Sequence, residues 1–372
     1  MMIRTVSRAL LLLVFALLGC ATAPRSTPPS PPTVDSRPAA PFEGQEASAS
    51  VLLERGQTLL ARGEPAAAAT ALRAALRRDP DLAAARASLG LALYALGDLD
   101  AAAEELRAAL RRQPDALDAR LVLARALAAR QEWPAAREEL DRVLLAQPDR
   151  LEARYLLGVV RYAQGDAAGA IDAYRRVLAV DPQQQDARYN LALVLKLARR
   201  ESEATPEFVA AAQAGHARAQ YFAGAAYAGG LGVERSLTTA IAWWFQAAEQ
   251  GVPQADEALA QLRQVALGRG RSGPTERGAA ERAFAEYRAA LWKEFPELTP
   301  GDETLGTVLL RQGRPAEAVT MLIREASALS QPAQRQLETL YEQGVDGVPP
   351  RDPRILAYMK GAAAEGLRPP LR

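Results

Sequence analysis

The sequence predicts an all-α fold in which short helical hairpins stack on one another, and three observations support this prediction. Apolar residues make up 49% of the 372 residues, yet aromatic residues make up only 6%, because alanine dominates the composition. Alanine has the highest helix propensity and loses no side-chain entropy on folding. Prolines recur every 34 residues, and small and large apolar residues recur in step with them. A chain of this length can form one elongated repeat array or two ordinary domains.

The amino terminus has the features of an export signal. Arg4 and Arg8 supply positive charge, an apolar run of ten residues follows at 9–18, and Gly19 provides a small residue before Cys20. Ten helical residues span about 15 Å, half of a bilayer core, so this run is too short for a transmembrane anchor.

The run Leu-Leu-Gly-Cys at 17–20 resembles the lipobox of bacterial lipoproteins. The resemblance implies that residues 1–19 are a signal peptide and that acyl chains on Cys20 anchor the protein in a membrane. By the sorting rule of enterobacterial lipoproteins, Ala21 implies transfer to the outer membrane, with the protein facing the periplasm. Residues 20–46 are rich in Pro, Ser and Thr without apolar periodicity, which predicts a disordered tether.

Three kinds of residue repeat with the same spacing along the next part of the chain. The 34-residue series are the prolines Pro80, Pro114, Pro148 and Pro182, the small residues Gly56, Gly90, Ala124, Gly158 and Ala192, and the large residues Leu72, Leu106, Leu140, Tyr174 and Phe208. Small residues let two helices approach closely, a large residue fills the layer between them, and proline ends the second helix. One hairpin cannot bury its apolar face alone, so stacking must supply the core.

This pattern resembles the tetratricopeptide repeat family, for instance in SLGLALYALGDLDAAAEELRAALRRQP. The resemblance implies a right-handed α-solenoid of helical hairpins over 47–214. Turns are expected at the Gly-acidic pairs that begin at Gly63, Gly97 and Gly165. A fifth, divergent unit has Arg199-Arg200 at its turn and Pro206 inside its second helix.

The segment 219–251 resembles a Sel1-like repeat, with matching residues that include Gly224, Tyr227, Trp243 and Gly251, which assigns 215–267 to that repeat type. A flexible break is expected at 268–275. Divergent hairpins of the two types are expected at 276–372, where Gly306 occupies the place of the repeat glycine and Tyr358 that of Trp243. A separate carboxy-terminal domain is the alternative.

In tetratricopeptide folds the first helices line the concave face, so the resemblance implies which side chains meet a partner. Tyr and Arg dominate binding hot spots because they bury a large area and keep a polar handle. The predicted partner-binding residues are Tyr94, Arg125, Tyr155, Tyr162, Tyr189 and Lys196. Packing between adjacent first helices is the alternative role for the tyrosines.

Trp243 and Trp244 are adjacent on a predicted helix and point about 100° apart, so both cannot lie fully in the core. We expect Trp243 to pack and Trp244 to offer a second contact surface.

Charge and residue counts argue against other classes of function. The 45 basic residues nearly balance 44 acidic ones, which gives no concentrated basic field for nucleic acid. One cysteine and one histidine cannot form a disulfide or a zinc site, so neither a metal nor another cofactor is predicted.

The sequence has no phosphate-binding glycine loop after a strand pattern, no GxSxG and no HExxH, and it indicates neither an enzyme nor a small-molecule substrate. A carboxylate-based glycan hydrolase within 276–298 is the remaining catalytic alternative.

The sequence therefore predicts a membrane-anchored scaffold whose partners are other envelope proteins or peptides. Its layout resembles that of lipoproteins that serve pilus, secretion or exopolysaccharide export complexes. A regulator or adaptor of peptidoglycan enzymes, using the same groove, is the alternative.

Overall fold

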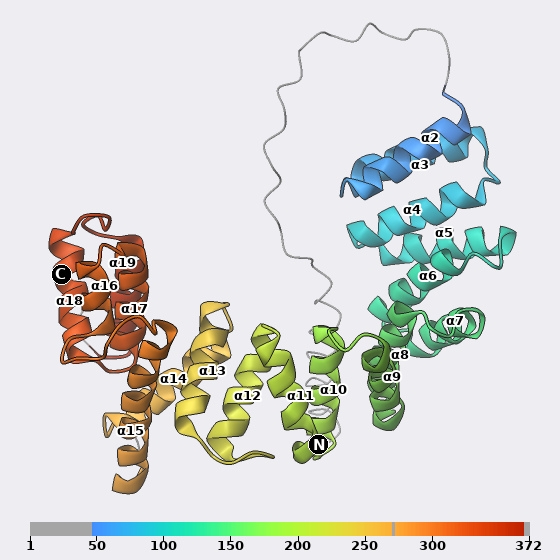
Figure 1. Ribbon diagram of the computed structural model, residues 1–372. Helices are drawn as coiled ribbons and strands as arrows, with labels where there is room; N and C mark the ends of the chain where they lie inside the picture. Colours follow the sequence, from blue (N-terminus) through green and yellow to red (C-terminus); the bar gives the residue numbers. More distant parts are fainter. Residues whose placement is uncertain (1–46, 270–271, 368–372) are drawn as a thin grey trace, which may run out of the picture. The chain divides into compact units, whose positions relative to one another are not determined.

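The computed structural model describes residues 47–269 and 272–367, which fold into helices joined by short connections (Figure 1). These residues contain no strand, and a single antiparallel bridge joins Val345 to Val348. The predicted all-α fold is therefore confirmed for the described part of the chain. The predicted signal peptide, Cys20 and the Pro-rich tether lie outside it. None of the described helices is both long enough and apolar enough to cross a bilayer.

The chain divides into two compact units, residues 1–194 and residues 195–372. The helices of the first unit are paired as hairpins, and each first helix also packs on the first helix of the next hairpin. They are α2 (Ala49–Ala61), α3 (Pro65–Arg78), α4 (Ala83–Leu96), α5 (Leu99–Arg112), α6 (Leu117–Ala129), α7 (Trp133–Ala146), α8 (Leu151–Ala163), α9 (Ala167–Val180) and the first part of α10 (Gln185–Leu197).

A glycine of the first helix faces a large side chain of the second in three of these hairpins. A Cβ atom added to Gly90 would lie 2.5 Å from Cγ of Leu106, and one added to Gly56 would lie 2.5 Å from Cγ of Leu72. In the fourth hairpin, Gly158 meets the fully buried ring of Tyr174. The predicted pairing of small and large residues is therefore the packing unit of the array.

A left-handed residue ends the first helix of every hairpin. Gly63, Gly97 and Gly165 have φ angles of 74°, 82° and 82°, and Gln131 occupies the equivalent place with φ 63°. Arg199, another 34 residues on, has φ 60°. The turn of the divergent fifth hairpin thus keeps its geometry without glycine. A residue with a side chain costs about 1 kcal/mol in this left-handed backbone conformation.

An arginine six residues after each repeat proline holds the connection between hairpins. Arg86 donates to the carbonyl of Pro80 at 2.9 Å and to Glu105 at 2.9 Å. Arg120 donates to the carbonyl of Pro114 at 2.5 Å and pairs with Glu139. In the next two repeats, the same bond runs from Arg154 to Pro148 and from Arg188 to Pro182.

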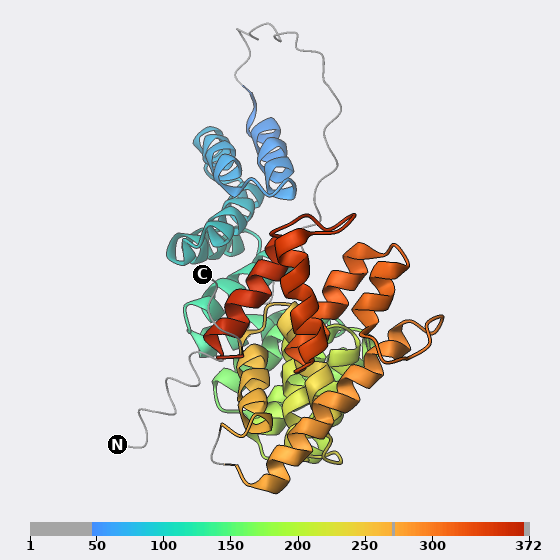
Figure 2. The same ribbon diagram turned by 90° about the vertical axis from the view of Figure 1, so that its left-hand side faces the viewer.

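The second unit is also helical, but its helices differ more in length (Figure 2 shows them from yellow-green to red). They are α11 (Glu201–Gln213), α12 (Ala217–Gly229), α13 (Leu237–Glu249), α14 (Pro253–Ala266), α15 (Pro274–Leu291), the 3₁₀ helix η2 (Trp292–Glu294), α16 (Leu305–Arg311), α17 (Pro315–Ser327), α18 (Gln331–Gln343) and α19 (Pro353–Ala364).

Local features of the second unit match several expectations. Helix α11 continues through Pro206. The hairpin of α16 and α17 repeats the packing of the first unit, because a Cβ on Gly306 would lie 2.3 Å from Cγ of Leu322 and Gly313 has φ 72°. The connection between α14 and α15 covers 267–273, of which residues 270–271 are not described, and the flexible break at 268–275 stays a prediction.

Candidate protein-binding site

The first-helix face of the first unit carries three of the six predicted partner-binding residues. We use this name for the accessible side chains of α2, α4, α6, α8 and residues 185–194. Tyr94, Arg125 and Tyr155 are half-buried there, from α4, α6 and α8. These three side chains keep accessible surface that a partner can meet.

Two predicted contact residues lie inside the array instead. Tyr162 is 8% exposed and Tyr189 is 5% exposed, and burial raises the pKa of the Tyr162 hydroxyl. Because both rings are buried, a partner could touch little of either. The alternative prediction, that the tyrosines serve in packing, fits Tyr162 and Tyr189. The prediction that these two side chains are accessible to a partner is wrong.

Tyr155 is held in place by its neighbours. Its hydroxyl accepts a hydrogen bond from Nδ2 of Asn190 at 2.8 Å, and its ring lies 5.9 Å from the ring of Tyr174, centroid to centroid. Asn190 is almost fully buried, and burial is the main cause that raises the pKa of Tyr174 well above its usual value. The hydrogen bond from the buried amide of Asn190 therefore fixes the orientation of the Tyr155 side chain.

Arg125 forms an ion pair with Glu152, which joins the middle helices α6 and α8 across the face. Both side chains keep about a third or more of their surface exposed, at 34% and 48%. Exposed pairs of this kind contribute about 0–1 kcal/mol to stability, so they exchange partners readily. The pair therefore suits recognition better than it suits stability.

Two further predictions concern the second unit. Lys196 belongs to that unit, where its ammonium lies 4.5 Å from the centroid of Phe222 and burial lowers its pKa. Trp244 is 7% exposed, its indole N–H donates to the carbonyl of Tyr221 at 3.2 Å, and its ring occupies the space beside Gly224.

The assignment of the two tryptophans was therefore reversed. Trp244 takes the place that Leu106 and Tyr174 take in the first unit, and Trp243 is the half-buried one. The expectation of a second contact surface at Trp244 is wrong. The spacing between glycine and large residue could have indicated this. It is 16 residues in the first unit, as from Gly90 to Leu106, but 20 from Gly224 to Trp244, because the connection between α12 and α13 is longer.

Sequence reasoning also missed Glu152 and Asn190. Asn190 could have been noticed as a polar residue inside the apolar run of α10, since a buried amide needs a partner. Glu152 has no such signal, because exposed acidic residues are frequent throughout the chain.

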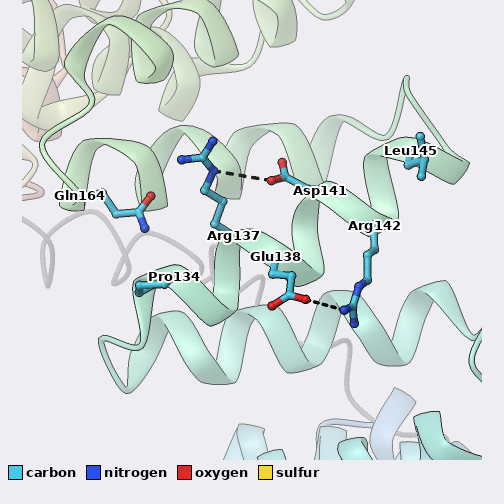
Figure 3. A pocket seen from close by; sticks show the side chains of 7 residues that line it. All are labelled: Pro134, Arg137, Glu138, Asp141, Arg142, Leu145 and Gln164. Atoms are coloured by element: carbon cyan, nitrogen blue, oxygen red, sulfur yellow. Dashed lines mark hydrogen bonds and ion pairs between the residues drawn. The ribbon is translucent and has the colours of Figure 1, made fainter.

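A shallow hollow of about 660 Å³ lies beside α7 (Figure 3). Its walls carry two ion pairs between successive turns, Arg137 with Asp141 and Glu138 with Arg142, and Leu145 at its edge is 85% exposed. Because these charged side chains satisfy one another in solvent, the hollow offers less for recognition than the first-helix face.

Three of the carboxylates in the segment considered for catalysis are engaged in ion pairs. Within 276–298, Glu281 pairs with Arg277, Glu294 with Arg324 and Glu297 with Arg314. The Arg314 guanidinium also holds the pKa of Glu297 below its usual range. No group of three or more His, Cys, Asp or Glu residues in the described part of the chain is arranged to hold a metal ion.

Comparison with known families agrees with this geometry. The tetratricopeptide repeat model matches the chain in four overlapping segments, 53–116, 88–147, 121–184 and 155–215. Residues 53–215 are tetratricopeptide repeats. Repeats of this family bind other proteins or peptides and generally have no catalytic role. No curated protein matches the sequence significantly.

Several solved structures are similar to the chain at the level of the repeat. They include MamA from Desulfovibrio magneticus RS-1, with 22% identity over 45% of this chain and 94% of that protein and a TM-score of 0.43. PilF from Pseudomonas aeruginosa has 22% identity over 57% and 97%, with a TM-score of 0.49. YrrB, titled a tetratricopeptide protein with an unusual peptide-binding site, has 21% identity over 45% and 86%, with a TM-score of 0.41. At TM-scores below 0.5 these similarities indicate nothing about partner or function.

Proposed function

We propose that the protein is a scaffold of a cell-envelope assembly, anchored by lipid on Cys20 in the outer membrane and facing the periplasm. The assembly would be a pilus, secretion or exopolysaccharide export complex, and the scaffold would bind its partner through the first-helix face. The observation that carries the binding role is the array of tetratricopeptide repeats with Tyr94, Arg125 and Tyr155 accessible on three successive first helices.

The chemistry of this face favours a polypeptide partner. Half-buried tyrosines bury apolar area at little entropic cost, and Tyr155 is already oriented by Asn190. The Arg125–Glu152 pair offers both a donor and an acceptor to a partner's backbone or side chains. A helix or an extended segment with apolar anchors fits this combination.

Photo-crosslinking in cells tests the proposed face. A benzoylphenylalanine at position 94 or at position 125 is expected to capture one dominant envelope protein, which mass spectrometry of the membrane fraction identifies. A matched probe at Glu104, which is exposed on the second helix α5, serves as the control. Equal capture from position 104, or only scattered background from 94 and 125, would refute the face.

The identity of the captured protein then decides between the assemblies, and a wall hydrolase would favour the peptidoglycan alternative. The anchor is tested separately with Cys20→Ser. This variant is expected to lose labelling by a fatty-acid probe and to leave the membrane fraction. If it stayed membrane-bound without label, the lipoprotein proposal would be wrong.

A further inference from the structure

We propose that a cavity between α14, α17 and α19 of the second unit binds one apolar side chain of a partner polypeptide, with a basic residue of that partner beside Asp256. The cavity is a second recognition site, and it does not depend on the first-helix face. Three observations support it: the shape and lining of the cavity, a glycine that the packing does not require, and an unbalanced negative charge at the rim.

The cavity has a volume of about 330 Å³. Its apolar walls come from four helices and include Phe245 of α13, Leu259 of α14, Ile323 of α17 and Tyr358 of α19. Helices α17 and α19 pack against each other (Figure 1), and α14 is joined to the end of α19 by side-chain hydrogen bonds. This volume lies at the lower end of the range for ligand sites, and it is large enough to admit an apolar side chain of a partner.

Gly361 lines this cavity from the last turn of α19. Glycine inside a helix costs about 0.5–1 kcal/mol relative to alanine. Gly90 and Gly306 are required by close contacts, but a Cβ on Gly361 would meet no atom within 4 Å. The folded chain therefore does not need glycine here, and its absent side chain leaves the backbone of α19 open to a group that enters the cavity.

The charges around the cavity leave one negative charge unbalanced. The guanidinium of Arg263 donates two hydrogen bonds to Glu365, at 2.7 and 2.5 Å, and Arg354 pairs with Asp352 at 2.8 Å. Asp256 also lines the cavity, and it forms no ion pair with a described residue.

Burial is the main cause that raises the pKa of the Asp256 carboxyl, with Glu365 acting in the same direction and Arg263 opposing. Asp256 is exposed at the rim of the cavity, where a partner's ammonium or guanidinium can pair with its carboxylate. Because the walls include large apolar side chains and Asp256 at the rim has no ion-pair partner among the described residues, the complementary occupant is a leucine- or phenylalanine-type side chain next to Lys or Arg.

The proposal can be tested with fluorescein-labelled nine-residue peptides and the full mature chain, by anisotropy. One peptide has a central Leu flanked by Lys, a second has the same Leu flanked by Glu, and a third has a central Ala flanked by Lys. The first peptide is expected to bind at least tenfold more tightly than either of the others, and more weakly at high salt.

Two variants and two matched controls locate the site. Gly361→Leu fills the cavity and is expected to weaken binding of the first peptide at least tenfold, while Gly361→Ala keeps it. Asp256→Asn is expected to weaken binding about fivefold, the equivalent of about 1 kcal/mol, and to remove most of the salt dependence. Glu257→Gln changes an exposed carboxylate that does not line the cavity and leaves binding unchanged.

Several outcomes would overturn the cavity site: absence of binding by the Leu-Lys peptide, equal binding of the Leu-Glu peptide, or unchanged binding to a Gly361→Leu variant whose circular dichroism is native. Crosslinking from position 94 distinguishes this proposal from the proposed function. If Gly361→Leu abolishes peptide binding while the crosslink persists, the two sites are independent. If the crosslink is never seen while the cavity binds, only the first-helix face fails.

Discussion

The first unit is stabilised by contacts within and between neighbouring hairpins, whereas the second unit combines such contacts with ion pairs between residues far apart in the sequence. In the first unit, Asn190 and Tyr155 are 35 residues apart, and Arg86 and Glu105 are 19 apart. In the second unit, Arg263 and Glu365 are 102 residues apart, and Arg324 and Glu249 are 75 apart.

The two cores also differ in chemistry. Alanine and leucine fill most of the first unit, while the second contains the stacked rings of Phe245 and Tyr287 at 4.8 Å and several buried charges. A repeat array gains stability from each neighbouring pair, so its residues can be small and regular. A unit of irregular hairpins has no such repeated interface, and specific polar contacts fix how its helices pack. Four predictions probe this difference.

The largest effect is expected for Arg263→Ala. Arg263 is 7% exposed, and its loss leaves the carboxylate of Glu365 partly buried without its partner, which costs about 3 kcal/mol. Hydrogen exchange with mass spectrometry should show faster exchange throughout the second unit and unchanged exchange in α4 to α7. The control is Arg277→Ala, an exposed pair within α15 that is expected to cost less than about 0.5 kcal/mol. Faster exchange confined to α14 and α19 would mean that the second unit is less cooperative than proposed.

The second prediction concerns the stability lost when alanine replaces the repeat glycine, and it tests whether the α16–α17 hairpin packs as the hairpins of the first unit do. Gly90→Ala and Gly306→Ala each place a Cβ within 2.5 Å of a leucine Cγ, so both are expected to lose about 1–3 kcal/mol in urea unfolding. Gly361→Ala, where the Cβ meets open space, is expected to gain about 0.5–1 kcal/mol. A tolerated Gly306→Ala together with a costly Gly90→Ala would show that α16 and α17 can move apart.

A smaller effect is expected at the connections between repeats. Arg120 bonds both the carbonyl of Pro114 and Glu139 in a largely buried setting, so Arg120→Ala should cost about 1–2 kcal/mol. Arg154→Ala should cost about half as much, because Ala173 stands where the equivalent acidic residue would be. Thermal unfolding of the two variants gives the comparison. Equal losses would show that the acidic partner contributes nothing.

The smallest effect concerns the pH dependence of the second unit. Glu325 is 4% exposed and accepts hydrogen bonds from the backbone N–H groups of Leu305 and Gly306, at 2.9 and 3.2 Å. Burial is the main cause that raises its pKa above the usual 4.5, so the carboxyl contributes stability at low pH that is lost as the pH rises through the folded-state pKa.

Glu325→Gln removes this titration. The stability of the variant relative to the natural chain is therefore expected to rise between pH 4 and pH 8, as measured by urea unfolding at each pH. Glu342→Gln, which changes an exposed acidic residue of α18, is the control. A difference that is independent of pH would show that Glu325 does not titrate on folding.

The sequence determined the features that depend on neighbours along the chain. The 34-residue series located the hairpins of the first unit, their glycine turns and the pairing of small with large residues. It also located the hairpin at Gly306, because the distance from helix to turn to helix is a local property. The composition and the absence of catalytic motifs directed attention to a binding role.

Only the tertiary structure decided which side chains are accessible. Helical periodicity places Tyr155, Tyr162 and Tyr189 on one face, but the approach of the adjacent helices buries the last two and leaves the first half-buried. In the same way, the longer connection before α13 turned Trp244 into the core. The pair Arg263–Glu365 and the cavity beside Gly361 join segments about 100 residues apart, and the local sequence carries no signal for such pairings because the packing of the whole second unit creates them.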